Sequence, residues 1–402
     1  MITKNSKLDN TIRRDSYNTI IFDLRRRKEI YLVGGYLRDV LRGIDSNDRD
    51  YIVRGNLPSF VRDVQRRIGG TIVTFKDKDI LRIVLKDRHS FDFSRFHGKL
   101  EDDISKRDFT INALAWSPQS GLIDLYNGKE DIRKRRVCAI SENNMIDDPL
   151  RMLRAFRFSA EMNGSVDTQT RKTIKHYHKK IDSVSPERIT LEIFHLLNAH
   201  FASKYIKMAL KDNILKDILP LSTNMLAHQL KVVDLVEKKI LHMLPSNIKV
   251  LLHDIYAQNL SYKGLLCLEI LLKDHSNYKY MPHLKMSNKI INRLTLTRNA
   301  TRELKRYKRI THDKLFEIFQ KAGKASIDSL VISNRLELLK TYRRFERIWA
   351  KSFLNADQIM RISGLGPGPE LGELVVSLKK SQFEGKLRSK HDACTMIKCM
   401  YA

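Results

Sequence analysis

The stretch from Ile30 to Gly55, IYLVGGYLRDVLRGIDSNDRDYIVRG, limits what this chain can fold into more than any other. It begins with a short apolar run rich in β-branched residues, which predicts a strand. Gly34-Gly35 then lets the backbone approach another group closely, and a helix carrying Arg38 follows. A second strand is expected from Asp48 to Val53. The order strand, glycine pair, helix, strand predicts a small α/β unit built around this turn.

Asp48 and Asp50 are two residues apart on the second predicted strand. Because strand side chains alternate, both carboxylates face one way and Arg49 faces the other. Two carboxylates beside a Gly-Gly turn and a helix start can hold Mg²⁺ against a triphosphate, which backbone N–H groups and Arg38 would cradle. The alternative for each feature taken singly is a plain turn and a solvated strand start.

Other segments of the N-terminal part fit the same unit. A basic helix is expected over residues 12–28, and helical periodicity runs from 57 to 68. Three runs have strand character, at residues 71–75, 80–85 and 90–94. The sequence therefore predicts a mixed sheet with helices in this region.

Gly34-Gly35, Arg38-Asp39 and Asp48-x-Asp50, in this order and spacing, resemble the first motif of the class II nucleotidyltransferases. That family includes the tRNA CCA-adding enzymes and the bacterial poly(A) polymerases. The resemblance implies that Asp48 and Asp50 are catalytic and bind Mg²⁺, and that Gly34, Gly35 and Arg38 bind the nucleotide. It also implies an α+β fold, in which a polymerase-β-type head precedes an all-α neck, body and tail.

The segment from Lys106 to Leu114, KRDFTINAL, resembles the second motif of the family. Lys106 is a departure, since an arginine is usual there and a lysine lacks the planar guanidinium fork. By resemblance, Arg107 contacts phosphate, whereas Asp108 and Asn112 order the sugar and the site.

The segment DDPLRMLRAFRF, residues 147–158, predicts a helix in which Asp148 is the N-cap and Pro149 the first helical residue. Asp148 and Arg151 are three apart and so share one helix face. A carboxylate can accept from the exocyclic amine of cytosine or adenine while a guanidinium donates to the ring nitrogen beside it. One such pair admits C and A and rejects U and G without a template.

This segment resembles the family's Glu-Asp-x-x-Arg motif, with Asp147 in place of the glutamate. Arg154 and Arg157 follow one and two turns after Arg151 and would bind phosphates, although a solvated basic face is the alternative. Residues 185–192 open a further helix, which we expect to support the base-selecting helix.

Composition indicates the partner. Lys and Arg outnumber Asp and Glu by 74 to 46, a net charge of +28, which favours a polyanion such as nucleic acid. No apolar run is long enough to span a membrane, and the polar N-terminus lacks a signal-peptide pattern. Four cysteines without zinc or disulfide spacing predict reduced thiols in a cytoplasm. The resemblance implies tRNA, CTP and ATP as binding partners.

Four domains are expected: a catalytic head at 1–137, a neck at 138–200, a body at 201–330 and a tail at 331–402. His228, His253 and Asp254 suggest a degenerate remnant of a metal-binding HD domain, or plain core helices. Residues 301–310 and 341–351 mix basic and aromatic side chains on predicted helices. They are candidates for contact with tRNA phosphates, or solvated helix faces.

The sequence between the third strand and the second motif bears on specificity. Only fourteen residues separate Asp92 from Arg107, and residues 95–103 look too short for the flexible loop of CCA-adding relatives. A missing loop resembles the CC-adding specialists, which need a separate A-adding partner. We favour CC addition over full CCA addition, with poly(A) synthesis a further alternative. Asp92 itself is either a further acidic residue of the site or a strand-edge aspartate.

A hypothesis from another class is a catalytically silent RNA-binding protein that keeps the fold. The acidic and basic motif residues, Asp48, Asp50, Arg107, Asp148 and Arg151, are all present and argue against it.

Overall fold

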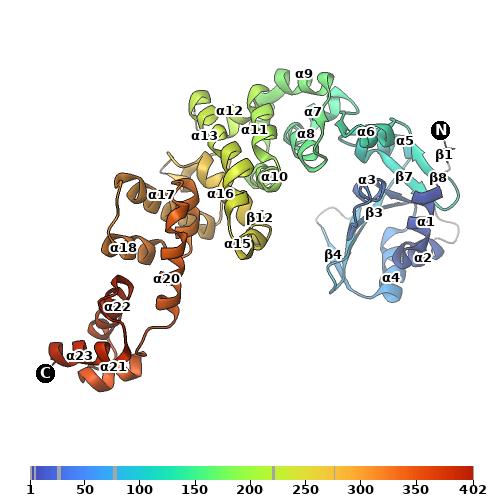
Figure 1. Cartoon of the computed structure of the whole chain (residues 1–402). Coiled ribbons are helices and arrows are strands. Elements are labelled where there is room, and N and C mark those ends of the chain that lie inside the picture. The colour runs from blue at the N-terminus through green and yellow to red at the C-terminus, as the bar shows by residue number, and fades with distance from the viewer. Residues whose placement is uncertain are drawn as a thin grey trace. The chain divides into compact units, whose positions relative to one another are not determined.

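A computed structural model describes residues 2–3, 6–24, 29–75, 79–219, 222–275 and 277–401. The chain forms two compact units, one of residues 1–225 with 282–284 and one of residues 226–281 with 285–402. Figure 1 shows the sheet in blue to teal and the helices of the second unit in yellow to red. The four-domain division predicted from the sequence stays a prediction.

A mixed sheet is the centre of the first unit, and in the described residues it has eight strands in the order β1-β8-β7-β2-β3-β6-β5-β4. Neighbouring strands are antiparallel except β3 and β6, which are parallel. The strands are β1 Ile2–Thr3, β2 Ile30–Val33, β3 Asp48–Val53, β4 Thr71–Thr74, β5 Ile80–Val84, β6 Ser90–Arg95, β7 Leu114–Ser117 and β8 Gly121–Asp124. The predicted mixed sheet is confirmed.

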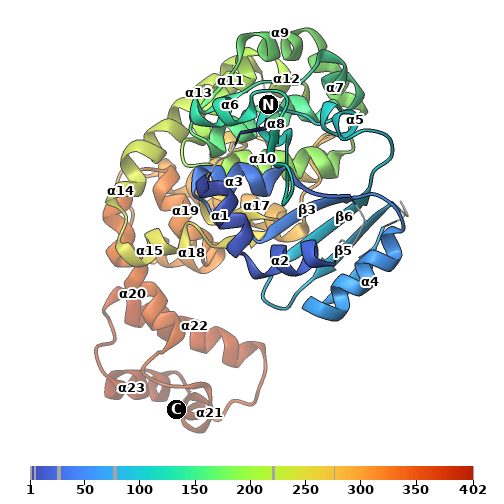
Figure 2. The ribbon, with the colours of Figure 1, turned by 90° about the vertical axis from the view of Figure 1, so that its right-hand side faces the viewer.

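Helices flank this sheet. They are α1 Ser6–Arg14, α2 Ser16–Asp23, α3 Gly35–Arg42, α4 Leu57–Ile68, α5 Leu100–Ser105 and α6 Gly128–Arg133, with a 3-10 turn η1 at Thr110–Asn112. Helix α4 packs on β5 and β6, with α2 beside it (Figure 2). Phe60, Val61 and Val64 of α4 are fully buried, since they recur at helical spacing on one face.

The single basic helix expected over residues 12–28 is wrong in one respect. The chain forms two helices, α1 and α2, because the Asp15 side chain accepts a hydrogen bond from the Asn18 N–H at 2.8 Å and caps a new helix. Residues 25–28 lie outside the described part of the chain.

The rest of the first unit is helical, as predicted. It contains α7 Glu142–Asp147, α8 Leu150–Glu161, α9 Thr168–Tyr177, α10 Pro186–Asn198, α11 Ala202–Lys211 and α12 Ile214–Ile218, with a 3-10 turn η2 at His178–Ser183. A short parallel pair, β9 Arg136–Val137 with β10 Ser165–Val166, interrupts the helices. Helices α10 and α11 both pack against α8. The prediction that the helix beginning near residue 185 packs against the helix after Asp148 is therefore confirmed, whereas the base-selecting role of that helix stays a prediction.

Helices also dominate the second unit. They are α14 Leu241–Met243, α15 Ser246–Leu251, α16 Tyr262–Leu271, α17 Asn288–Arg306, α18 His312–Ala322, α19 Ala325–Ile332, α20 Leu339–Ala350, α21 Ala356–Ser363, α22 Pro369–Glu384 and α23 Lys390–Tyr401, after α13 Thr223–Leu235, which starts in the first unit. Shorter elements are a π-helical turn η3 Val236–Ile240, 3-10 turns η4 Tyr278–Tyr280 and η5 Leu336–Leu338, and an antiparallel pair β11 Ile255–Ala257 and β12 Leu260–Ser261. Among the described residues, none of the helices is both long and apolar enough to cross a membrane.

Helix α17 organises this second unit. Its buried residues recur every three or four positions, which makes one continuous stripe that packs against α18 and α19. The buried residues are Ile290, Arg293, Leu294, Thr297, Ala300, Thr301 and Leu304. Two of the seven are threonines, so the core beside α17 contains hydroxyl groups.

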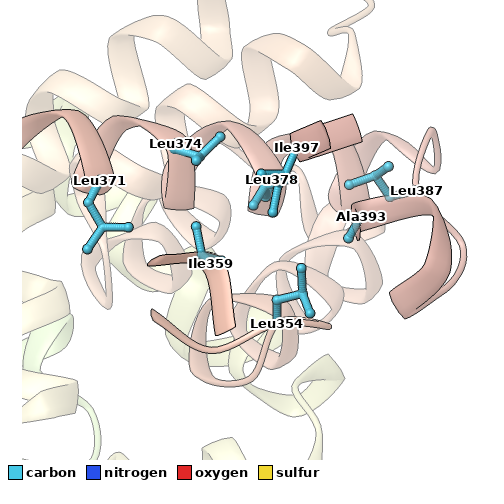
Figure 3. Packing of buried hydrophobic residues seen from close by; sticks show 8 residues of the cluster. All are labelled: Leu354, Ile359, Leu371, Leu374, Leu378, Leu387, Ala393 and Ile397. Atoms are coloured by element: carbon cyan, nitrogen blue, oxygen red, sulfur yellow. The ribbon is translucent and has the colours of Figure 1, made fainter. Parts of the chain in front are cut away.

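The last three helices share a small hydrophobic core. Leu371, Leu374 and Leu378 follow one another along α22 at helical spacing and meet Ile359 of α21 and Ile397 of α23 (Figure 3). Gly385 ends α22 in the left-handed conformation, with φ of 83°.

Candidate active site

A pocket of about 460 Å³ in the first unit brings the predicted site residues together. Its lining comes from the turn before α3, from β3, from the segment after α5 and from α8. The lining residues are Gly34, Gly35, Arg38, Asp50, Arg107, Asp108, Asn112, Asp148, Arg151, Arg154, Arg157 and Phe158. Of the predicted residues only Asp48 is outside this lining. A larger cavity of about 800 Å³ elsewhere in the unit contains none of them.

Gly34 allows the side chains of Arg107 and Asp50 to approach the backbone of the turn before α3. Its φ is 78°, where residues with a side chain are strained, and its N–H donates to the Leu114 carbonyl at 3.1 Å. A Cβ at this position would lie 2.8 Å from Arg107 Nη1 and 3.2 Å from Asp50 Oδ2. The absent side chain therefore leaves space for a guanidinium and a carboxylate beside the turn.

The alternation predicted for β3 is confirmed. Arg49 is buried on one face, where it binds the Asp15 carboxylate at 2.5 Å and lies 4.9 Å from the Tyr36 ring centroid. Asp48 and Asp50 face the other way, and Asp48 is exposed and accepts a hydrogen bond from Ser90 Oγ at 2.5 Å. The Arg49 contacts fix the strand, so the direction of both carboxylates is fixed as well.

Asp50 lies near two other carboxylates, those of Asp48 and Asp92. It is directly opposite Asp92 in the parallel β3/β6 ladder. Burial raises the pKa of Asp50 to about 6, and the Asp92 and Asp48 carboxylates contribute to the increase. Arg82 on β5 binds Asp92 through both oxygens, at 2.5 and 2.6 Å, and so balances its charge. Asp92 therefore lies next to Asp50, and its carboxylate is paired with the Arg82 guanidinium.

This carboxylate pair fits a divalent cation. Burial, with the neighbouring Asp92 and Asp48 carboxylates, raises the pKa of Asp50, and a cation such as Mg²⁺ would stabilise its charged form. Carboxylate oxygens are the preferred ligands of such a cation. In the described residues, no group of three or more His, Cys, Asp or Glu side chains is arranged to hold a metal. That finding applies equally to His228, His253 and Asp254 in the second unit.

A chain of hydrogen bonds ties the second motif to the neighbouring helices. Arg38 Nη1 donates to Asn112 Oδ1 at 2.7 Å, and Asn112 Nδ2 donates to Asp108 Oδ1 at 2.9 Å. Arg154 donates to Asp108 Oδ2 at 2.7 and 2.9 Å. Burial alone would raise the pKa of Asp108, but Arg154 and these hydrogen bonds hold it below its usual value. Arg38 Nε and Nη2 also donate to the Asp39 carboxylate, each at 3.0 Å. The contact of Arg38 with phosphate stays a prediction.

Arg107 differs from Arg38 because it keeps donors for a ligand. Its Nε is buried without a hydrogen-bond partner among the described residues, and its Nη2 is 3.4 Å from Asp103 Oδ2. A buried, unsatisfied guanidinium nitrogen at the pocket wall suits an anionic ligand such as a phosphate.

The helix start predicted at Asp148 is wrong by one residue. Pro149 occupies the N-cap position of α8 and no side chain caps the helix there. The Asp148 carboxylate instead accepts from Arg188 of α10 at 3.0 and 3.2 Å, and lies 3.9 Å from Arg151 Nε. The Asp148 carboxylate does not cap the helix. It lies between the guanidinium groups of Arg188 and Arg151 at the pocket.

Phe158 is a pocket residue that the sequence reasoning missed. Three guanidinium carbons lie near its ring centroid: Arg38 at 4.9 Å, Arg154 at 5.1 Å and Arg157 at 4.1 Å. Glu192 of α10 lies 3.5 Å from Arg154 and 3.2 Å from Arg157. An apolar residue on a helix is usually a core residue. The available signal was the spacing, because Phe158 is four residues after Arg154 and so lies on the same helix face as this arginine.

The mixed sheet, the Asp-x-Asp strand beside a glycine turn and the arginine-lined pocket are the features that the motifs of the sequence predicted for this part of the chain. Residues 30–138 match the poly A polymerase head domain family, and residues 165–226 match the family described as the probable RNA and SrmB-binding site of polymerase A. Both matches fall on segments whose motifs resemble the class II nucleotidyltransferases, and they agree with that resemblance.

Individual relatives agree with this family. The chain is 34% identical over 189 residues to a CC-adding tRNA nucleotidyltransferase of Synechocystis, covering 46% of this chain and 45% of the relative. It is 30% identical over 206 residues to a CCA-adding enzyme of Leuconostoc mesenteroides, covering 46% of this chain and 50% of the relative. The chain thus spans about half the length of the curated relatives it matches.

The fold has a solved counterpart over nearly the whole chain. A Thermotoga maritima CCA-adding enzyme, solved in complex with tRNA, aligns with a TM-score of 0.77. The alignment covers 99% of this chain and 98% of that one at 18% identity. The predicted α+β fold with a helical remainder is therefore confirmed.

Proposed function

We propose that the chain is a tRNA nucleotidyltransferase, which adds C residues to the 3′ end of tRNA from CTP and releases pyrophosphate. The observation that carries this proposal is the pocket in which Asp50, Arg107, Asp148 and Arg151 converge. It combines a carboxylate for metal, an unsatisfied guanidinium for phosphate and an Asp/Arg pair for a base. Each component of a nucleoside triphosphate thus has a complementary group.

In the proposed reaction, the 3′-oxygen of the RNA attacks the α-phosphorus of the nucleotide. The bond to the bridging oxygen of the β-phosphate breaks, pyrophosphate leaves and the hydroxyl loses its proton. Mg²⁺ bound by Asp48 and Asp50 would neutralise developing charge and lower the pKa of the hydroxyl. Arg107 holds the triphosphate beside the Gly34 turn, so the reacting atoms are oriented before attack.

Base selection is assigned to the start of α8. The Asp148 carboxylate accepts from the exocyclic amine of C or A, and Arg151 donates to the adjacent ring nitrogen. Arg188 and the hydrogen bond from Arg151 Nη1 to the Lys106 carbonyl, at 2.9 Å, restrict both groups before the nucleotide binds. Arg154 and Arg157 complete the phosphate side, although Asp108 and Glu192 also bind them.

We further propose CC addition rather than CCA addition. Strand β6 ends at Arg95 and α5 begins at Leu100, so the connection between them is short. Phe96 and Leu100 at its two ends are buried, and Arg54 donates to the Gly98 carbonyl within it. Such a fixed connection offers no long loop that could reshape the pocket from C to A. A separate A-adding enzyme would then complete the tRNA, in the cytoplasm that the sequence predicts.

The alternative is full CCA addition, favoured by the similarity to the Leuconostoc enzyme. The test is incorporation of labelled CTP and ATP, separately and together, into tRNA that ends at the discriminator base. CC addition predicts two C residues and a halt when both nucleotides are present. A product ending in A would refute the CC proposal and leave the nucleotidyltransferase proposal intact.

A silent RNA-binding protein is tested with Asp48→Ala and Asp50→Ala. Loss of incorporation with retained tRNA binding supports catalysis by this pair. The matched control is Asp63→Ala, which removes a carboxylate of α4 that pairs with the exposed Arg66. Binding without incorporation by the unmodified protein would favour the silent alternative.

A further inference from the structure

A further, smaller pocket lies wholly within the second unit. Its volume is about 120 Å³, and it lies between the end of α16, one face of α17 and Ile332 of α19. The side chains that matter are Lys273 and Asp274 after α16, with Arg298, Thr301, Arg302 and Lys305 on α17. None of them belongs to the candidate active site.

The rim of this pocket has an excess of positive charge. Lys273, Arg298, Arg302 and Lys305 all line it, and within the described residues none of the four forms an ion pair with a carboxylate. Burial and the nearby Lys273 cation lower the pKa of Lys305, so the cations are close enough to repel one another. An anion between them would relieve that repulsion.

The floor of the pocket supplies unsatisfied polar atoms. Thr301 is 7% exposed, and its hydroxyl has no hydrogen-bond partner among the described residues. Arg298 Nε is also buried without a partner, whereas its Nη1 is fixed by the His275 carbonyl at 2.9 Å. Buried polar groups are normally paired, so two orphan donors at one pocket indicate a missing ligand.

Two acidic residues face the same pocket, and neither opposes an anion strongly. Gln229 donates to the Asp274 carboxylate at 2.6 Å, which engages one of its oxygens. Glu269 is buried at the floor, where Thr297 donates to its Oε1 at 2.6 Å. Burial and the Asp328 carboxylate raise the pKa of Glu269 well above its usual value, so its unpartnered Oε2 can hold a proton and act as a donor.

We propose that this pocket binds one phosphate group of an RNA backbone. Cations around a floor of hydroxyl and N–H donors match a tetrahedral anion. The volume of about 120 Å³ is well below the 460 Å³ of the nucleotide pocket, so a phosphate fits and a whole nucleotide does not. Among the described residues that line the pocket, none is aromatic, so no platform for stacking a base is present there. This favours recognition of the backbone rather than of sequence. The inference rests on the proposed function, since it takes tRNA as the RNA.

The test uses the full chain and measures tRNA binding as a function of salt. The charge variant is Arg302→Gln with Lys305→Gln. The packing-neutral variant is Thr301→Val, which removes only the hydroxyl. The control is Lys321→Gln with Lys340→Gln, which removes two exposed cations from the same unit outside this pocket. Inorganic phosphate and pyrophosphate are titrated in parallel, so that a free anion can be told from an RNA phosphate.

We expect the charge variant to bind tRNA about tenfold more weakly than the control variant. The slope of log Kd against log salt should fall by about 1. Thr301→Val should weaken binding in the same direction without changing that slope by as much. In initial-rate assays, the charge variant should show a higher KM for tRNA than the control variant.

Equal tRNA binding by the charge and control variants would overturn the inference and leave the proposed function standing. Loss of pyrophosphate or phosphate binding alone, with tRNA binding unchanged, would assign the pocket to a free anion and overturn it too. Conversely, weakened tRNA binding in a protein that incorporates no nucleotide would support the pocket while refuting the proposed function.

Discussion

Gly34→Ala separates the geometry of the pocket from the stability of the fold. The new Cβ would lie 2.8 Å from Arg107 Nη1, in a backbone conformation with φ of 78° and ψ of −135° that favours glycine. The strain costs about 1–3 kcal/mol of unfolding free energy. The guanidinium is the mobile end of a side chain, so it can move away at little further cost in stability. Its position beside the triphosphate is then lost.

The expected loss of activity follows from that displacement. A hydrogen bond to a charged group contributes about 1.5–3 kcal/mol, so kcat/KM for CTP should fall by about 10- to 150-fold. The control is Gly43→Ala at the other end of α3, where φ is 72° and no atom lies within 4 Å of the new Cβ. It should lose about 1–2 kcal/mol of stability and keep its activity.

Urea unfolding and initial rates of CTP incorporation, measured on both variants, give the two quantities. If Gly34→Ala retains the kcat/KM of Gly43→Ala, then the close approach of Arg107 and Asp50 to the turn does not matter for the reaction. Our account of the glycine would then be refuted.

Three further predictions concern the pocket wall. Phe158→Leu removes a ring that faces three guanidinium groups, and each such contact contributes about 0.5–2 kcal/mol. The KM for CTP should therefore rise, and a KM equal to that of the unmodified protein would contradict this. Arg188→Met releases the Asp148 carboxylate, and UTP incorporation relative to CTP should increase in a competition assay, whereas Arg188→Lys should show less of the change. Asp108 has a lowered pKa when folded, so its contribution to stability is present above its unfolded pKa of about 3.9 and is lost as the pH falls through the folded value. Asp108→Asn should therefore flatten unfolding free energy against pH below about 5, and an unchanged profile would exclude this contribution.

The sequence was most informative where chemistry requires particular residues at fixed spacing. Strand β3 matches the predicted range from Asp48 to Val53, since its aromatic and β-branched residues Tyr51, Ile52 and Val53 favour a strand. The glycine pair and the two arginine-rich motifs meet in one pocket, as the resemblance implied. These motifs are local, and local patterns are readable without knowledge of tertiary contacts.

Contacts between distant segments were not readable in the same way. Asp148 looked like an N-cap because its neighbours in the sequence favour that role, but Arg188, forty residues later, provides a stronger partner for the carboxylate. The ion pair of Arg82 with Asp92 depends on the register of two strands, which no single-strand pattern specifies. Phe158 looked like a core residue, and only the fold shows which arginines surround its ring.

Helix α10 contacts the pocket-lining residues of the α8 segment at two places. Arg188 binds the Asp148 carboxylate, which we propose selects the base, and Glu192, one turn later, lies beside Arg154 and Arg157, which we propose bind phosphate. These contacts couple the two helices, so a shift of α10 would move Asp148 together with Arg154 and Arg157. Variants selected for a new nucleotide preference should therefore include changes on the buried side of α10, in residues that never meet the substrate, and their altered preference should come with altered triphosphate affinity.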